Sequence, residues 1–271
     1  MQDKKTRDII FLSSIFLSAW SHQPSDRKNN MKGRFNWIRI AQCVVALACA
    51  FALKLYYSTA SADELRWILA PTTALVELLS GASFEFESHA GYISRERGFL
   101  IANSCSGVNF LITAFLMLSM RKLLGDRSKK VSWGFIPTTA VIAYLTTLVA
   151  NTARISVALR LRQMPAGAGW LNPDQLHRFE GVFIYFGFLL LLFVINEKMD
   201  SEETSGLFRQ SLFPLLVYYA TMLGIPLANG AYRQGADFME HALFVLLIPL
   251  LLILPLAAFR FIRDPWARWK R

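Results

Sequence analysis

The hydrophobic residues of this chain occur in long runs that are separated by short clusters of charged residues. A helix that crosses a bilayer needs roughly 20 mostly apolar residues. The segments that meet this requirement run roughly from Trp37 to Tyr57, Ser104 to Met120, Trp133 to Leu159, Gln175 to Ile195, Leu212 to Ala231 and Phe238 to Phe261. The pattern therefore predicts an all-α, multi-pass transmembrane helical bundle with about six clear spans.

Two further apolar stretches are too short to cross a bilayer. The stretch from Trp67 to Leu79 contains Pro71 and Glu77, and its roughly 13 residues reach only about 20 Å of a hydrocarbon core of about 30 Å. We interpret it as a re-entrant or interfacial helix on the outer side. We interpret Ile9 to Trp20 as a signal-like or interfacial helix that is not cleaved, because no A-x-A site follows it. Met31 is an alternative start of the protein.

A different pattern occupies the segment between the first two spans. From Phe84 to Ala102, apolar and polar residues alternate around Gly91 and Gly98. Alternation interrupted by glycine is typical of short strands joined by turns. We therefore expect a small extracytoplasmic hairpin or loop that leads into the second span.

The composition narrows the class of protein. The chain has 271 residues, of which 54% are hydrophobic, and a formal net charge of +10. These values exclude a soluble enzyme and a disordered tail, and three cysteines are too few for a secreted disulfide module. The basic charge lies in short clusters between apolar runs, which is typical of loops flanking a bilayer, so we expect no nucleic-acid partner.

The positive charges decide which ends of the spans face the cytoplasm. They cluster before the first span, in the loop after the second and at the C-terminus (Lys28, Lys32, Arg34; Arg121, Lys122, Arg127, Lys129, Lys130; Arg260, Arg263, Arg268, Lys270, Arg271). The positive-inside rule puts all three clusters in the cytoplasm, which six crossings allow. The prediction is a cytoplasmic or interfacial N-terminal segment (1–34), one transmembrane domain (35–262) and a basic cytoplasmic tail (263–271), in the cell (inner) membrane.

This topology brings three reactive side chains to the same depth on the outer side. Cys105 starts the second span, Arg154 lies near the outer end of the third, and His177 starts the fourth. A thiol at a helix start favours its thiolate, and an imidazole can take and return the thiol proton. A guanidinium stays charged and can stabilise an oxyanion. Asn151 shares a helix face with Arg154 and can orient that guanidinium or the substrate.

Each of these residues also has a purely structural interpretation. Cys105 taken alone would be a packing residue, as we expect Cys43 and Cys49 to be in mid-span. Arg154 taken alone could snorkel to the interface, and His177 could simply begin a helix. The convergence of all three at one depth favours the catalytic interpretation.

Four neighbouring residues are expected to support the site. Ser104 and Ser106 flank the cysteine and are candidates for capping hydroxyls, and Gly107 could permit close helix packing. His241, near the outer start of the last span, either joins the site as a peripheral substrate contact or only packs.

The sequence contains no motif for the other intramembrane chemistries. It lacks H-E-x-x-H, a G-x-S-x-G elbow, a phosphate-binding glycine-rich loop and a pair of membrane aspartates. We therefore expect no cofactor and no metal site.

At these residues the sequence resembles the exosortase/archaeosortase family of multi-pass membrane transpeptidases. That family carries A-x-x-C-S-G, then N-x-x-R, then a histidine followed by glycine, and the matching segments here are Ala102 to Gly107, Asn151 to Arg154 and His177 to Gly181. The resemblance covers about Trp67 to Ile195. Within the family, the run from Ser104 to Ile112 looks most like the exosortase K subgroup.

The resemblance implies a sorting reaction on the extracytoplasmic side of the membrane. The substrate would be an exported protein with a C-terminal motif, a transmembrane helix and a basic tail, presented in the lipid bilayer. Cys105 would attack it to form a thioester, which water or an unknown surface nucleophile would resolve. His177 would act as base and acid, and Arg154 would stabilise the transition state.

Two other functions remain open from the sequence alone. The chain could be a non-enzymatic polytopic protein, such as a transporter or a polysaccharide-assembly factor, in which Arg154 and His177 bind an anionic ligand. It could also be an acyltransferase that uses His177 without Cys105.

Overall fold

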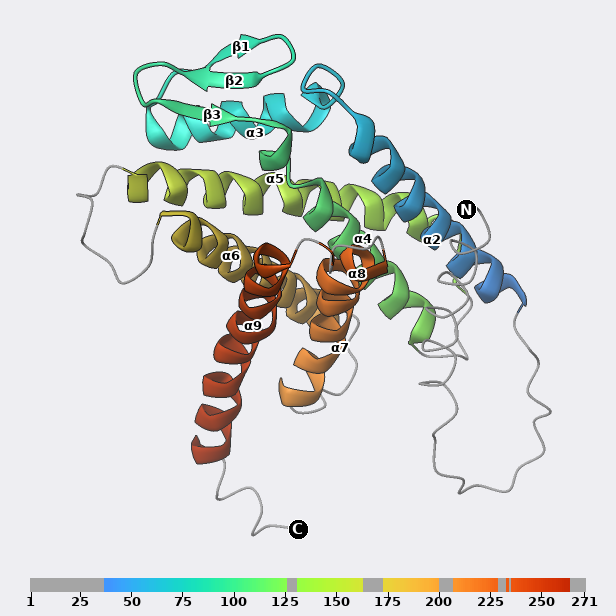
Figure 1. The fold of residues 1–271 in the computed structure, drawn as a ribbon. Helices are drawn as coiled ribbons and strands as arrows, with labels where there is room; N and C mark the ends of the chain where they lie inside the picture. The colour runs from blue at the N-terminus through green and yellow to red at the C-terminus, as the bar shows by residue number, and fades with distance from the viewer. Residues whose placement is uncertain are drawn as a thin grey trace, which may run out of the picture.

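The computed structural model describes residues 37–125, 131–162, 173–199, 207–228, 233 and 235–263. The apolar stretch from Ile9 to Trp20, Met31 and the basic tail beyond residue 263 lie outside these residues. The described part of the chain is mostly helical, as the sequence predicts, with one small sheet (Figure 1).

Five helical segments are long and apolar enough to cross a membrane. They lie in α2 (Trp37–Thr59), α4 (Val108–Leu124) with the turn before it, α5 (Phe135–Arg162), α6 (Pro173–Met199) and α9 (Ala236–Arg263). Each coincides with a span predicted from the apolar runs. The described residues therefore form a multi-pass helical membrane protein.

The structure describes the sixth predicted span, Leu212 to Ala231, as far as Ala228. Here α7 (Leu207–Tyr219), a π-helical turn η2 (Ala220–Gly224) and α8 (Ile225–Ala228) follow one another. The apolar helical part, Leu212–Leu227, reaches only about 24 Å at 1.5 Å per residue. Within the described residues this apolar helix is shorter than the five span-length helices, so the sixth crossing stays a prediction.

The predicted short helix is present as α3 (Arg66–Ser80). Gly81 ends it in the left-handed conformation (φ 67°), with its N–H donating to the Glu77 carbonyl at 2.8 Å. The helix lies between the sheet and α5 (Figure 1). Tyr144 of α5 fixes it there, because its hydroxyl donates to the Trp67 carbonyl at 2.8 Å and its ring stacks on the Trp67 ring.

The alternating segment forms a three-stranded antiparallel sheet. Its strands are β1 (Glu85–Glu87), β2 (Gly91–Ser94) and β3 (Phe99–Ile101), in the order β1-β2-β3. Gly91 pairs at the start of β2 with φ 122°, and a Cβ there would clash with the Ile101 carbonyl oxygen. Only glycine therefore permits this sheet. β3 runs directly into the turn that carries Cys105.

The central helix of the bundle is α4. It packs against α2, α5, α6 and α7, and most of its side chains are buried. Small hydroxyl residues join it to its neighbours. Thr113 donates to Thr221 after α7 at 2.9 Å, and Ser119 lies 3.2 Å from the Thr139 hydroxyl of α5. Cys105 lies in the turn immediately before this central helix.

A carboxylate outside the spans ties the chain after α2 to the β1–β2 turn. Asp63 accepts hydrogen bonds from the His89 backbone N–H at 2.9 Å and from the Ser88 hydroxyl at 3.1 Å. The hydrogen bond from the His89 N–H, supported by that from Ser88, lowers the pKa of Asp63. His89 itself adopts φ 65°, an uncommon conformation that this contact holds in place.

We expect this tie to hold at neutral pH and to open in acid. A carboxyl with a folded pKa below its unfolded value of about 3.9 gives its full stabilisation above that value, and loses it as the pH falls through the folded pKa. Exchange of the His89 amide hydrogen, relative to its intrinsic rate, should therefore be slow at pH 7 and faster below about pH 4. Asp63→Asn should remove the pH dependence, whereas the exposed Glu85→Gln should not. Equal protection of the His89 amide hydrogen at pH 7 and below about pH 4 would show that ionised Asp63 does not hold the turn.

Candidate active site

The turn between β3 and α4 holds Cys105 by its backbone. The 3-10 turn η1 (Asn103–Cys105) is closed by a hydrogen bond from the Cys105 N–H to the Ala102 carbonyl at 2.8 Å. Asn103 anchors this turn to the chain after α2, because its amide donates to the Ala60 carbonyl at 2.9 Å. The thiol is half-buried. Its position is therefore set by the sheet on one side and by α4 on the other.

Gly107 allows α5 to approach this turn closely. It caps the start of α4 with φ 75°, and a Cβ there would lie 3.1 Å from Asn151 Cγ and 3.2 Å from Thr147 Cγ2. Through this close approach the Asn151 side-chain amide donates to the Cys105 carbonyl at 2.6 Å. The motif glycine thus has a packing role, as the sequence suggested.

Gly107→Ala is expected to destabilise the protein more than Gly98→Ala. Both glycines have positive φ, which costs a non-glycine residue about 1–2 kcal/mol, but a Cβ at Gly98 meets nothing within 4 Å. The alanine at 107 must also push Asn151 away, so we expect a total cost above about 2 kcal/mol. Thermal unfolding of both variants in the same detergent measures the difference. Equal unfolding temperatures for the two variants would show that Gly107 and Asn151 are not in tight contact.

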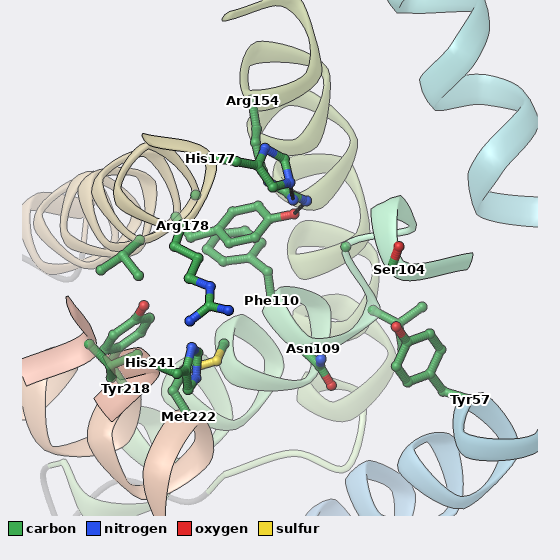
Figure 2. A pocket seen from close by; sticks show the side chains of 16 residues that line it. Tyr57, Ser104, Asn109, Phe110, Arg154, His177, Arg178, Tyr218, Met222 and His241 are labelled. Atoms are coloured by element: carbon green, nitrogen blue, oxygen red, sulfur yellow. Dashed lines mark hydrogen bonds between the residues drawn. The ribbon is translucent and has the colours of Figure 1, made fainter. Parts of the chain in front are cut away.

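A chain of hydrogen bonds continues from Asn151 to the predicted histidine. The Tyr185 hydroxyl of α6 donates to Asn151 Oδ1 at 2.8 Å, and Arg154 Nη1 donates to the Tyr185 hydroxyl at 3.1 Å. The other terminal nitrogen, Nη2, lies 2.9 Å from His177 Nε2 (Figure 2). The Cys105 backbone and the His177 ring are thereby linked through three side chains.

The hydrogen bond to Arg154 assigns the tautomer of His177. A guanidinium only donates, so Nε2 of the imidazole accepts and the proton is on Nδ1. Nδ1 in turn lies 3.8 Å from Oε2 of Glu180, one turn along α6. In this structure His177 is therefore a neutral imidazole with Arg154 on one nitrogen and a carboxylate near the other.

Gly181 lets the guanidinium lie against α6. A Cβ at this position would stand 3.3 Å from Arg154 Nε. The Tyr185 ring lies beneath the guanidinium, with 5.4 Å between the Arg154 Cζ atom and the ring centroid, and it stacks on Phe110 of α4. In this structure the arginine is therefore packed against α6 and over a pair of stacked rings from α4 and α6.

These side chains border a pocket of about 210 Å³ between α4, α6, α9 and the η2 turn (Figure 2). Its polar residues include Arg154 and His177 at one end and Arg178 and His241 at the other. Its apolar wall includes Val108, Phe110, Val182, Tyr218, Met222 and Val245. Arg178 Nη1 also lies 3.2 Å from Glu240 Oε2, an ion pair that joins α6 to α9 beside the pocket.

The structure brings most of the predicted site residues together, but it does not join the Cys105 thiol to His177. Arg154, His177, Asn151 and Gly107 form one cluster, and Cys105 lies within electrostatic range of Arg154. Within the described residues, however, no hydrogen bond joins the Cys105 thiol to His177, and the thiol side chain is not among those that line the pocket. Cys105 therefore does not line the pocket, whereas its neighbour Ser104 does.

The structure places the two serines and His241, which were predicted to support the site, in different surroundings. Ser104 lines the pocket, and His241 lines its far end. Ser106 is fully buried and its hydroxyl has no hydrogen-bond partner. The capping interpretation of both serines is wrong, because Gly107 is the N-cap of α4 and no side-chain hydroxyl bonds to that helix start. The left-handed glycine turns the chain, so the serines do not face the first free N–H groups.

Sequence reasoning missed Tyr185, Glu180 and Arg178. Tyr185 and Glu180 were detectable in principle, because residues three, four and eight positions after His177 lie on the same face of a helix. Glu180, Gly181 and Tyr185 occupy these positions. The pairing of Arg178 with α9 had no such signal.

Comparisons with protein-family models, with curated proteins and with solved structures gave no match. Within the described residues, no group of three or more His, Cys, Asp or Glu side chains is arranged to hold a metal ion. The side chains of the site are those of nucleophilic and acid–base chemistry.

Proposed function

We propose that the protein is an integral-membrane cysteine transpeptidase or protease that cleaves C-terminal sorting signals of exported proteins, as the exosortase/archaeosortase family does. One observation carries the proposal. Cys105, Asn151, Tyr185, Arg154 and His177 belong to one hydrogen-bonded cluster at a common depth in the bundle. Three motifs far apart in the sequence meet in this cluster.

The reaction begins with transfer of the Cys105 thiol proton to Nε2 of His177. Because an imidazolium has no acceptor nitrogen, the contact between Nε2 and Arg154 Nη2 must open in this step. The released guanidinium donors can then turn toward the reacting carbonyl. In the resting site, therefore, Arg154 occupies the His177 nitrogen that must accept the thiol proton.

The thiolate sulfur then attacks the scissile carbonyl carbon of the sorting signal. Arg154 stabilises the resulting oxyanion, together with the free N–H groups at the start of α4, which border the pocket. The C–N bond breaks, the amine leaves with the proton from His177, and an acyl thioester remains on Cys105. An acceptor nucleophile, or water, gives its proton to His177 and releases the acyl group.

The proposed orientation puts the site on the extracytoplasmic side of the cell membrane, with both termini in the cytoplasm. The basic clusters of the sequence support it. A membrane-impermeant maleimide added outside intact cells should label the protein, and Cys105→Ser, which leaves Cys43 and Cys49 in place, should remove that label. Labelling only after the membrane is opened would reverse the orientation.

The thioester is the direct test of the mechanism. The protein is purified from its own membranes after rapid acid quenching and digested, and the peptide that contains Cys105 is analysed by mass spectrometry. We expect a peptide adduct on Cys105 that hydroxylamine removes, and no such adduct on Cys49. An unmodified Cys105 in membranes that are actively processing exported proteins would overturn the proposal.

A second candidate function is supported by the lining of the pocket. Arg154, His177, Arg178 and His241 all border it, whereas the Cys105 thiol does not. This favours a non-enzymatic protein that binds an anionic ligand. The two candidates differ in their response to Cys105→Ala, which would abolish cleavage but leave anion binding unchanged.

A further inference from the structure

Glu180 is a buried carboxylate for which the steps above have no role. It lies in α6 with 5% of its surface exposed, and its Oε1 has no hydrogen-bond partner. Its Oε2 lies 3.8 Å from Nδ1 of His177. A carboxylate inside a span is costly, so such residues generally face a partner or a functional site.

The charged groups around His177 explain why this carboxylate matters. From α5, Arg154 contacts Nε2, and from the turn before α4 the Cys105 thiol lies within electrostatic range of the same arginine. From α9, Glu240 is paired with Arg178. The other polar residues that line the pocket are His241 of α9, Tyr185 of α6, Tyr218 of α7, Tyr57 of α2, and Ser104 and Asn109 around the start of α4. Glu180 is therefore the carboxylate in this cluster that faces His177.

The charge balance of the proton transfer depends on this carboxylate. At rest the cluster holds the positive Arg154 and the negative Glu180, with Cys105 and His177 neutral. After the proton moves from Cys105 Sγ to His177 Nε2, a thiolate and an imidazolium are added to these two charges. Without Glu180 the new imidazolium would have no negative charge beside its Nδ1.

We propose that Glu180 is a positioning residue that keeps the His177 proton on Nδ1 and stabilises the imidazolium when Cys105 loses its proton. The inference rests on the proposed function, because it assigns Glu180 to the same reaction. Glu180 does not touch the substrate and takes up no proton itself. Glu180 also lies within electrostatic range of Arg154, but its effect on Cys105 passes through the ring of His177.

The test measures the reactivity of the Cys105 thiol without any substrate. In a background of Cys43→Ser and Cys49→Ser, only Cys105 reacts with iodoacetamide, and the alkylation rate is measured in nanodiscs from about pH 5 to about pH 10, around the ordinary thiol pKa of about 8.5. Glu180→Gln keeps the shape and removes the charge. Glu197→Gln is the matched control, because Glu197 is a carboxylate of the same helix with 8% exposure, paired with Arg121 instead.

We expect the parent protein to be alkylated well below the pH at which an ordinary thiol reacts. Glu180→Gln should lower the rate at pH 7 by about tenfold and move the profile toward that of an ordinary thiol, and Glu197→Gln should leave it unchanged. Glu180→Asp, which keeps the charge, should restore most of the reactivity. In the His177→Gln background, Glu180→Gln should have no further effect, because its influence passes through the imidazole.

Failure of this inference and failure of the proposed function look different. If the parent protein is activated and Glu180→Gln has the same profile, Glu180 is not a positioning residue and the thiol mechanism stands. An added effect of Glu180→Gln in the His177→Gln background would equally rule out the proposed role. If the parent thiol itself behaves as an ordinary cysteine, the proposed function is wrong. Should Glu180→Gln fail to fold, Glu180→Asp with a parent-like profile still supports the role of the charge, and an ordinary-thiol profile contradicts it.

Discussion

Replacing Cys105 by alanine is expected to abolish cleavage of exported proteins that carry the C-terminal signal. The sulfur forms the covalent intermediate, and no other nucleophilic side chain is assigned to the cluster, so the rate should fall by at least about a thousandfold. The fold should persist, because Cys105 is held by backbone hydrogen bonds that alanine also makes. Processing is followed by the change in mass of a tagged signal-bearing protein in the same membranes.

Cys49→Ala is the matched control for this substitution. Cys49 is an exposed thiol of α2, away from the cluster, so its loss should leave processing unchanged. Unchanged processing in Cys105→Ala would exclude the thiol mechanism. It would favour the acyltransferase that relies on His177 alone, or the protein that binds an anionic ligand.

Replacing Arg154 by lysine is expected to lower the rate by about a hundredfold or more, the usual cost of removing an oxyanion donor. The guanidinium reaches the Tyr185 hydroxyl with one terminal nitrogen and His177 with the other. A lysine has a single ammonium and cannot hold both partners in one plane. The loss should therefore appear in kcat rather than in substrate affinity, as measured on a signal peptide in nanodiscs.

Arg160→Lys serves as the control for Arg154→Lys. Arg160 lies on the same helix and is exposed in its last turn, so a lysine there should be neutral. A full rate in Arg154→Lys would show that only a positive charge is needed. That result would remove the planar, two-partner role of the guanidinium from the mechanism.

The sequence was sufficient for the arrangement of the spans, apart from one of them. Apolar runs of about 20 residues have few alternatives to a helix in a membrane, because their backbone groups must bond within the segment. The five span-length helices and the short α3 follow from this rule. The sixth predicted span, Leu212 to Ala231, stays a prediction, because the structure describes it only as far as Ala228 and its apolar helix there, Leu212–Leu227, is shorter than the others.

The candidate site was partly accessible from the sequence. The depth of Cys105, Asn151, Arg154 and His177 follows from their places at the ends of apolar runs. Depth alone does not give the rotation of a helix about its axis. That rotation is set by packing, here by the close approach of Gly107 to Asn151 and of Gly181 to Arg154.

By itself, then, the sequence determined that this is a helical membrane protein, and which polar residues lie at one depth in it. The tertiary structure alone decided that Arg154 lies between Tyr185 and His177, that Glu180 faces the imidazole, and that Cys105 is not among the residues that line the pocket. The physical reason is that the apolar length of each segment, taken by itself, indicates whether that segment forms a membrane helix. A hydrogen-bonded cluster instead depends on the relative rotation and distance of several helices, which only their mutual packing sets.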